Sequence, residues 1–335
     1  MLTRYLAPLN YDRFFKKVFS DVQIAKRFLE DFLGVTIDEI ELLSTDYKIT
    51  DDAIAVEFDY RCKIGNQYVV IDMQQWYKTD IVKRFYVYFT LNSVAQLEDI
   101  PVKSLNIGDG KQRETRNYDA INPAITLIWM VDDTLKFEED YIAYAVLPEQ
   151  SVDFIKNDIL WETQNLEHLT QERNKVLSIL NNNAKNLDFL AKNRLIYIFQ
   201  KNIVKNKKYS PYFQWFDFAE KTKNKNNKKE DFVEFEKNKS IMLAINRLRT
   251  DKLKSEEFQY IDDFEKFRLQ VEIHDEVIRK EGRQEGRQEG IEIGIQNLML
   301  NSDFSDEKIA NLMNVDVSFV KKIRQHTEEE KSKKR

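Results

Sequence analysis

The sequence is poor in residues that cross-link a fold or interrupt regular structure. It contains one cysteine, Cys62, which excludes an intramolecular disulfide framework and favours a reducing compartment. Only 8 glycines and 5 prolines occur in 335 residues, which favours helix-rich architecture with few tight turns. No apolar run approaches the roughly 18 residues of a membrane span, and residues 1–15 lack the apolar core of a signal peptide. We therefore expect a cytoplasmic protein with no membrane partner.

Several common chemistries lack their signatures. His168, His274 and His326 are scattered without the spacing of metal ligands, so we interpret them as structural or surface residues. There is no Walker loop, no dinucleotide-binding fingerprint and no zinc motif. Cys62 has no neighbouring histidine in the sequence, so a buried structural thiol is expected rather than a nucleophile.

The overall charge neither favours nor excludes a nucleic-acid partner. The 52 basic and 57 acidic side chains give a net charge of -5, but phosphate affinity depends on local clusters of lysine and arginine. Two such clusters occur, at 201–210 (KNIVKNKKYS) and at 221–230 (KTKNKNNKKE). The second is consistent with a solvated low-complexity loop or with a surface that contacts phosphates.

The order of the segments predicts an α/β (α+β) domain over 1–175. Apolar spacing predicts two helices within 11–34, separated near Ser20 and Asp21 and closed by Gly34. Strands are expected at 38–49, 53–64, 67–74, 124–131 and 141–147, with a long helix at about 79–97. The length of 335 residues implies at least one further module.

Beyond residue 175 the periodicity is helical, and we divide this part into a helical region at 176–265 and a tail at 266–335. The segment 281–295 (EGRQEGRQEGIEIGI) places Gly282, Gly286, Gly290 and Gly294 along one helical stripe. Each glycine costs a helix about 1 kcal/mol relative to alanine, which favours close approach of another helix and a homo-oligomer. A flexible charged linker is the alternative. Residues 305–326 predict two short helices, as a helix-turn-helix or as a plain helical hairpin.

A two-residue turn sets the register of the most informative hairpin. Only Gly65 and Asn66 separate the strands that end at Ile64 and begin at Gln67. Stepping back along both strands pairs Asp59 with Asp72 and Glu57 with Gln74 on one face. The opposite, apolar face then contains Ile54, Val56, Phe58, Tyr60, Cys62, Ile64, Val69, Ile71 and Met73.

The predicted pairing of two carboxylates needs a compensating interaction. At about 5 Å and an effective dielectric near 20, Asp59 and Asp72 repel each other by roughly 3 kcal/mol. A hard divalent cation such as Mg²⁺ or Mn²⁺ reverses the sign of this interaction. Proton sharing, which raises the pKa of one carboxyl group, is a second explanation. A solvent-exposed face on which Arg61 and Lys63 dilute the repulsion is a third, and the sequence leaves all three open.

These residues resemble a known nuclease core. An aspartate on one strand, a hairpin, Asp-x-Gln at the end of an apolar strand and then a helix, all preceded by a helix, resemble the PD-(D/E)xK superfamily. This resemblance implies a restriction-endonuclease-like core with a central mixed sheet flanked by helices. Within it, the sequence is most similar to the Rpn-type recombination-promoting nucleases, a family also described as transposases. The similarity covers 11–19 (YDRFFKKVF), the strand with Asp59, 69–74 (VVIDMQ), the helix with Arg84 and Tyr88, and the glycine-rich tail. Residues 176–280 carry no specific motif of this kind.

The resemblance implies a role for each matching residue. Asp59 and Asp72 would bind Mg²⁺ or Mn²⁺, and Gln74 would occupy the position of the motif lysine. Asp12 would complete the metal shell and Arg84 would contact a phosphate. Three departures stand out: Phe58 replaces the motif proline, Asp72 replaces the usual glutamate, and Gln74 brings no positive charge. An amide orients water by hydrogen bonding but brings no charge to offset the charge of the transition state.

The function implied by the resemblance is a magnesium-dependent DNA endonuclease associated with recombination or mobile DNA. Asp59, Asp72 and Gln74 would be its catalytic residues and DNA its substrate. The alternative is a catalytically silent nuclease fold that acts as a DNA-binding or protein-interaction module. The net charge and Gln74 favour the alternative, whereas the opposed aspartates favour the enzyme.

Overall fold

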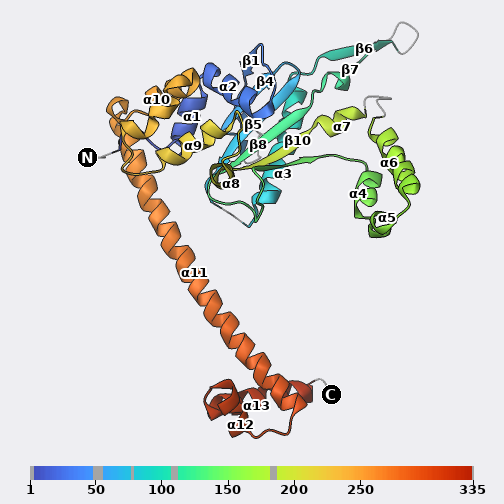
Figure 1. Ribbon diagram of the computed structural model, residues 1–335, viewed down its shortest axis with the longest axis vertical. Coiled ribbons are helices and arrows are strands. Elements are labelled where there is room, and N and C mark those ends of the chain that lie inside the picture. Colours follow the sequence, from blue (N-terminus) through green and yellow to red (C-terminus); the bar gives the residue numbers. More distant parts are fainter. Residues whose placement is uncertain (1–3, 48–55, 77–78, 107–111, 182–186, 334–335) are drawn as a thin grey trace. The chain divides into compact units, whose positions relative to one another are not determined.

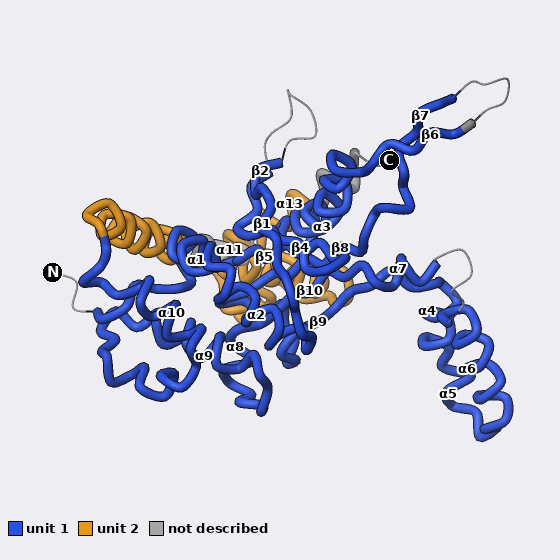
Figure 2. The backbone as a smooth tube through the Cα atoms, turned by 90° about the horizontal axis from the view of Figure 1, so that it is seen from above, with its two compact units in different colours: residues 1–253 blue, residues 254–335 orange. Residues whose placement is uncertain are grey.

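The computed structural model describes residues 4–47, 56–76, 79–106, 112–181 and 187–333. The chain forms two compact units, Met1–Leu253 and Lys254–Arg335 (Figure 2). The first contains the sheets and the candidate site, and the second is helical. Within the described residues, no helix combines the length and the apolarity needed to cross a membrane.

The first unit is built around a mixed sheet of six strands in the order β1-β4-β5-β8-β10-β9 (Figure 1). Strands β5, β8 and β10 are parallel neighbours, and the remaining pairings are antiparallel. The six strands are β1 (Ile40–Leu42), β4 (Tyr60–Ile64), β5 (Gln67–Gln74), β8 (Ala124–Met130), β9 (Tyr141–Ala145) and β10 (Arg194–Phe199). Two small hairpins pair β2 (Asp46–Tyr47) with β3 (Val56–Glu57) and β6 (Val102–Asn106) with β7 (Gln112–Arg116). The prediction of a mixed sheet with flanking helices is confirmed.

Helices of the first unit surround this sheet and extend from it (Figure 1). They are α1 (Asp12–Phe19), α2 (Val22–Leu33), α3 (Ile81–Val94), α4 (Glu149–Lys156), α5 (Asp158–Glu162), α6 (Leu166–Leu180), α7 (Asp188–Lys192), α8 (Gln200–Asn206), α9 (Phe213–Thr222) and α10 (Lys239–Leu248). Short 3-10 helices are η1 (Ala95–Glu98), η2 (Tyr118–Ala120), η4 (Lys229–Lys237) and η5 (Thr250–Lys252).

The two N-terminal helices form as the apolar spacing predicts. Asp21 caps α2, because its side chain accepts a hydrogen bond from the Gln23 backbone N–H at 3.0 Å. Gly34 ends the same helix with a φ of 68°, a left-handed conformation that glycine adopts without strain. The predicted break near Ser20 and the predicted C-cap are therefore confirmed.

One face of the sheet packs against α1, α2 and α9 through aromatic rings. Trp129 of β8 lies 5.5 Å from Phe28 of α2 and 4.4 Å from Phe216 of α9, measured between ring centroids. Phe15 of α1 meets the same indole edge-on at 5.8 Å. These contacts place α1 against the carboxyl half of β8.

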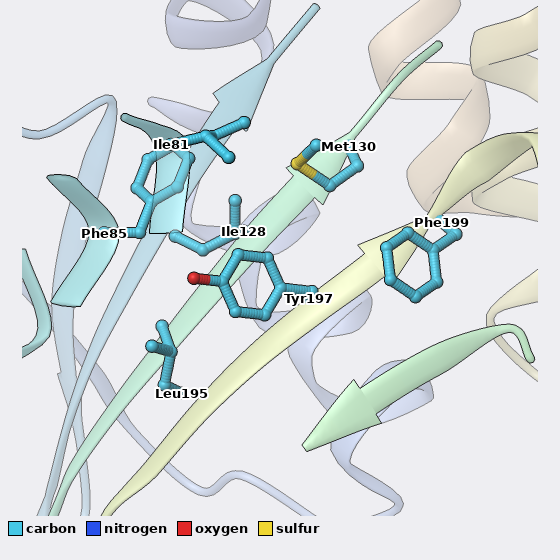
Figure 3. Packing of buried hydrophobic residues seen from close by; sticks show 7 residues of the cluster. All are labelled: Ile81, Phe85, Ile128, Met130, Leu195, Tyr197 and Phe199. Carbon is cyan, nitrogen blue, oxygen red and sulfur yellow. The ribbon is translucent and has the colours of Figure 1, made fainter. Parts of the chain in front are cut away.

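The other face packs against α3. Ile81 and Phe85 of α3 lie over side chains of β8 and β10 in a buried cluster (Figure 3). The cluster contains Ile81, Phe85, Ile128, Met130, Leu195, Tyr197 and Phe199. Asn92 of α3, fully buried, donates to the backbone oxygens of Tyr68 and Ile125. This amide fixes α3 to β5 and β8 at once.

The Gly65-Asn66 turn sets the expected register, but the pairing stops earlier than predicted. Ile64 lies opposite Gln67 and Tyr60 opposite Ile71, and Gly65 takes the positive φ of 53° that the tight turn needs. Before Tyr60 the chain bends at Asp59. The expectation of one continuous strand to residue 53 is therefore wrong over its described part.

Beyond this bend the predicted partners and faces change. Glu57 belongs to β3 and pairs with Asp46, so its predicted pairing with Gln74 is wrong. Phe58 packs with Val70 and Leu91 on the α3 side, so its assignment to the opposite face is also wrong. The bend reverses which face of the sheet the preceding side chains point to. The alternation of polar and apolar residues does not predict this reversal. Ile54, assigned to the same face, lies outside the described residues.

Strand β10 corrects the predicted organisation of 176–265. Residues 194–199, expected to be helical, form a strand between β8 and β9 and run parallel to β8. Five of its six residues are buried, so the strand shows no alternation of polar and apolar side chains. The predicted boundary at residue 175 therefore lies inside the first compact unit, which extends to Leu253.

The second unit consists of α11 (Ser255–Asn301), α12 (Asp306–Met313) and α13 (Val317–Lys333). Ile295 of α11 packs with Ile309, Ala310, Val320 and Ile323 of the two shorter helices. The glycine-rich segment is helical throughout, so the flexible-linker interpretation is wrong. A Cβ at Gly294 would lie 2.6 Å from Met313 Cε, whereas open space surrounds Gly286 and Gly290.

We expect a chain that ends at Leu253 to unfold cooperatively, because it keeps all six strands of the central sheet. A chain that ends at residue 175 loses β10, which joins β8 to β9, and should show no cooperative transition. Thermal unfolding followed by circular dichroism, with the full chain as reference, distinguishes the two. A cooperative transition in the shorter chain would contradict the central position of β10.

Candidate functional site

Strand β5 carries Asp72 and Gln74 to the carboxyl end of the parallel strands. Asp72 lies beside Ile128 and Gln74 beside Met130, so both are on the face that α3 covers. Asp72 is 2% exposed and Gln74 is 5% exposed. The interpretation as a solvent-exposed polar face is therefore wrong. Arg61, which was expected to dilute the repulsion in solvent, is itself buried.

Asp59 lies at the bend before β4, beside Asp72 and Met73 of β5. Its Oδ2 accepts a hydrogen bond from the Met73 backbone N–H at 2.8 Å. Tyr60 pairs with Ile71, so Asp59 is one position beyond the last pair and Asp72 is the corresponding position of β5. The turn therefore brings the two aspartates together, although Asp59 directs its carboxylate to the backbone.

Both carboxyl groups hold their protons more tightly than an exposed aspartate. Burial raises the pKa of Asp59, and the negative charge of Asp72 and a hydrogen bond with Asp12 raise it further. Burial also raises the pKa of Asp72, while the charge of Arg84 and the Asp59 backbone N–H partly counteract this effect. Asp72 Oδ2 is buried without a hydrogen-bond partner among the described residues. An unsatisfied buried carboxylate oxygen is costly unless a proton or a cation reaches it.

Lys16 of α1 brings a positive charge to this pair, and the sequence analysis missed it. Its Nζ lies 2.6 Å from Glu57 Oε1, 3.3 Å from Asp12 Oδ1 and 3.7 Å from Asp59 Oδ1. Burial lowers the pKa of Lys16, but Glu57 and the charges of Asp12 and Asp59 more than offset this and raise it. The spacing of Asp12 and Lys16, four residues apart on one helical face, is the signal that was available.

Arg84 of α3 holds Gln74 in place. Its Nη1 donates to Gln74 Oε1 at 3.2 Å and its Nε to Tyr88 Oη at 3.3 Å. The Gln74 amide in turn donates to the Trp76 carbonyl oxygen at 2.7 Å. Gln74 thus keeps one N–H and one oxygen lone pair for a water or a substrate. Burial lowers the pKa of Arg84, but Tyr88, Asp72 and Asp59 raise it overall, so the guanidinium stays charged.

Asp12 is near the pair but does not complete a cluster of ligands. Its side chain is half exposed and contacts Lys16, and it shares a hydrogen bond with Asp59. Within the described residues, no three acidic, histidine or cysteine side chains converge closely enough to bind a metal ion. The prediction that Asp12 completes the metal shell therefore finds no support in this arrangement.

A divalent cation nevertheless fits the two buried aspartates. Mg²⁺ commonly binds through one or two carboxylates and keeps several waters. Asp72 Oδ2 has no hydrogen-bond partner among the described residues, and Asp59 Oδ1 lies 3.7 Å from the ammonium of Lys16. These two oxygens are the protein ligands that the site offers.

No protein-family model, curated protein or solved structure matches this chain. The fold is a mixed α/β arrangement with a six-stranded sheet and a helical C-terminal region. A nuclease core is consequently a proposal that rests on the site and on the sequence resemblance.

The raised pKa values predict how stability depends on pH without metal. Between pH 3.8, the ordinary pKa of aspartate, and their raised pKa values, Asp59 and Asp72 bind more protons in the folded state than in the unfolded chain. The free energy of unfolding should therefore fall as the pH rises from about 4. We expect Asp72→Asn to flatten this dependence, because the amide needs no proton.

Urea unfolding in EDTA at several pH values between 5 and 9 measures the effect. Asp119→Asn, at a side chain that is 81% exposed, is the matched control and should leave the dependence unchanged. An equal slope in the wild type and in Asp72→Asn would show that Asp72 does not hold a proton in the folded state.

Proposed function

We propose that this chain is a metal-dependent nuclease that hydrolyses phosphodiester bonds of DNA, with a restriction-endonuclease-like core. One observation carries the proposal: Asp59 and Asp72 are brought together at a strand end, and an oxygen of Asp72 is buried without a partner among the described residues. A purely structural sheet gains nothing from this arrangement, because two buried carboxyl groups cost stability. Perturbed carboxyl groups of this kind are typical of catalytic sites.

The aspartates have the role of binding the cation. Bound Mg²⁺ or Mn²⁺ would act as a Lewis acid and lower the pKa of a coordinated water. Asp59 and Asp72 supply the carboxylate oxygens that hold it. Gln74, fixed by Arg84, offers an N–H and an oxygen lone pair that orient the attacking water.

Two cations of the chain act on the phosphate. In the hydrolysis, a water oxygen bonds to phosphorus, the bond from phosphorus to the sugar oxygen breaks, and that oxygen takes up a proton. Negative charge grows on the phosphate oxygens during this step. Arg84 on α3 and Lys16 on α1 stand near Asp59 and Asp72, and both remain charged. Lys16 thus supplies the positive charge that Gln74 lacks.

The choice of DNA and the association with recombination or mobile DNA rest on the resemblance to Rpn-type nucleases. The matching stretches include 69–74, which ends β5, and 11–19, which forms α1. Asp59 connects these two segments, because its Oδ1 lies 3.7 Å from Lys16 Nζ and its Oδ2 accepts a hydrogen bond from the Met73 backbone N–H. The resemblance and the geometry therefore point to the same place in the chain.

Cleavage of supercoiled plasmid tests the proposed activity. We expect nicking in Mg²⁺ or Mn²⁺, none in EDTA, and a loss of about 100-fold or more in Asp72→Asn and in Asp59→Asn, because each removes a ligand charge. Asp119→Asn, far more exposed, should keep full activity. Gel electrophoresis of time courses measures the rates.

Activity that survives EDTA or both aspartate substitutions would refute the site. Complete inactivity of a folded wild type would favour the second candidate, a silent nuclease fold that acts as a DNA-binding or protein-interaction module. The absence of a third acidic ligand within the described residues favours this candidate. The open space beside Gly286 and Gly290 leaves room for a second α11, so we propose self-association as part of it.

Replacement of Lys16 separates its catalytic role from metal binding. We expect Lys16→Met to slow cleavage about tenfold or more. The same substitution should tighten Mn²⁺ binding by at least about threefold, because the ammonium no longer competes for Asp59. Titration calorimetry on the DNA-free protein measures the metal affinity.

Lys26→Met on α2 is the matched control and should change neither quantity, since its Nζ donates to the Asp38 carbonyl oxygen at 3.1 Å and lies outside the aspartate site. Weaker metal binding together with slower cleavage in Lys16→Met would show that Lys16 only supports the shape of the site.

A further inference from the structure

Two adjoining hollows of the first unit lie between α2, the α8–α9 loop and the start of α10. Their volumes are about 550 and 400 Å³, and both are lined by Arg27, Gln214 and Asn238. The same elements gather on one side of the first unit in Figure 2. We call the two together the basic hollow.

Cations dominate the lining of the basic hollow. It includes Arg27, Lys207, Lys208, Lys237 and Lys239, with Asp31 as the single acidic residue. Asp31 is buried and already engaged, since it pairs with Arg27 at 2.8 Å and accepts from Trp215 Nε1 at 2.9 Å. One carboxylate therefore neutralises one of five cations.

The four lysines are available for an external anion. Lys208 is 3.8 Å from Asp140, a long contact at an exposed side chain. Lys207, Lys237 and Lys239 are exposed and make no ion pair with any residue that the structure describes. Like charges that gather around a concave surface raise its potential and attract polyanions.

The backbone at Lys207 adopts a conformation that is strained for a lysine. This residue ends α8 in the left-handed conformation, with φ 49° and ψ 34°. Glycine or asparagine usually occupies such a position, because other side chains are strained there. A lysine that accepts this strain puts a positive charge on the rim of the hollow.

Tyr209 offers an aromatic surface beside these charges. Its relative exposure is 107%, so the ring is not covered by any residue that the structure describes. It also lines the hollow, directly after Lys207 and Lys208. An exposed ring next to cations is the combination that stacks unpaired bases while lysines contact the phosphates.

Neutral groups at the hollow also suit phosphate. Asn238 caps α10, a helix of 10 residues, by accepting from the Ser240 and Ile241 backbone N–H groups. The positive end of this helix thus faces the second hollow. Asn238 Nδ2 donates to Gln214 Oε1 at 3.1 Å, which leaves the Gln214 amide hydrogens for an acceptor.

We infer that the basic hollow binds a single strand of nucleic acid, with phosphates on its lysines and one unpaired base stacked on Tyr209. The choice of nucleic acid over other polyanions rests on the proposed function. The hollow itself uses none of the residues of the aspartate site. Neither of the basic clusters at 201–210 and 221–230 predicts this hollow by itself. Arg27, Lys207 and Lys239 are far apart in the sequence and come together only in the fold.

Fluorescence anisotropy with labelled oligonucleotides tests the inference on the full chain. Measurements in EDTA make the result independent of metal and cleavage. We expect a 20-nucleotide single strand to bind more tightly than the matching blunt duplex. Lys207→Gly, Lys237→Ala/Lys239→Ala and Tyr209→Ala should each weaken strand binding at least about fivefold.

The salt dependence gives a second readout. Each lysine removed from a phosphate contact should lower the slope of log affinity against log salt by about 0.7 for a single strand, and Tyr209→Ala should leave the slope unchanged. Lys83→Ala/Lys156→Ala removes two exposed lysines outside the hollow and should leave affinity within twofold of the wild type.

Measurements of the unfolding temperature and of DNA cleavage distinguish the possible outcomes. Lys207→Gly should unfold at the wild-type temperature or above it, because glycine relieves the left-handed strain. Unchanged strand binding in all three variants, equal losses in the control, or tighter duplex binding would overturn the inference. Loss of strand binding in the variants with no cleavage by the wild type would refute the nuclease while the hollow stands.

Discussion

Burial of β8 on both faces is the constraint on which the rest of the first unit depends. All seven of its residues are buried, with Trp129 directed to α1, α2 and α9 and its neighbours Ile128 and Met130 directed to α3. Helices are therefore needed on both faces of the sheet to cover β8. Because β5 and β10 run parallel to β8, the three strands end together, and polar side chains in their last residues meet at one edge. Asp72 and Gln74 lie at this edge for that reason.

The aspartate site has an energetic cost that the core must offset. Asp72 is almost completely buried, and one of its oxygens has no partner among the described residues. Lys16 and Arg84 reduce the cost through their charges, but neither is within ion-pair distance of Asp72 in the described structure. A side chain that is stabilised only in part stays receptive to a cation. Sites that violate local rules of stability in this way are commonly functional.

The elements that local rules control could be predicted from the sequence. Gly65 and Asn66 set a register that brings Asp59 to Asp72, and Gly34 ends α2. β10 could not be recognised, because a strand buried on both faces shows no alternation and its apolar run resembles a helix segment. The bend at Asp59 likewise has no signal in the local sequence. Because of this bend, Glu57 pairs with Asp46 and not with Gln74 as predicted.

Lys16 shows why part of the site was not foreseeable. Within its helix it looks like an ordinary solvated residue with Asp12 as partner. Its contacts with Glu57 and Asp59 arise from segments about forty residues away, after the bend has turned both toward α1. Only the position of α1, held by Phe15 against Trp129, brings these charges together.

The net charge of -5 conceals two cationic environments with different physics. Lys16 and Arg84 are partly buried beside carboxylates, where salt screens their interactions weakly. Lys207, Lys237 and Lys239 are exposed, so their attraction for polyanions decays with ionic strength. The first environment fits the proposed stabilisation of charge during a reaction, and the second fits the inferred reversible binding of a strand. In this proposal the exposed lysines attract the phosphates of a strand from solution, whereas Lys16 and Arg84 act on the phosphate at the aspartate site.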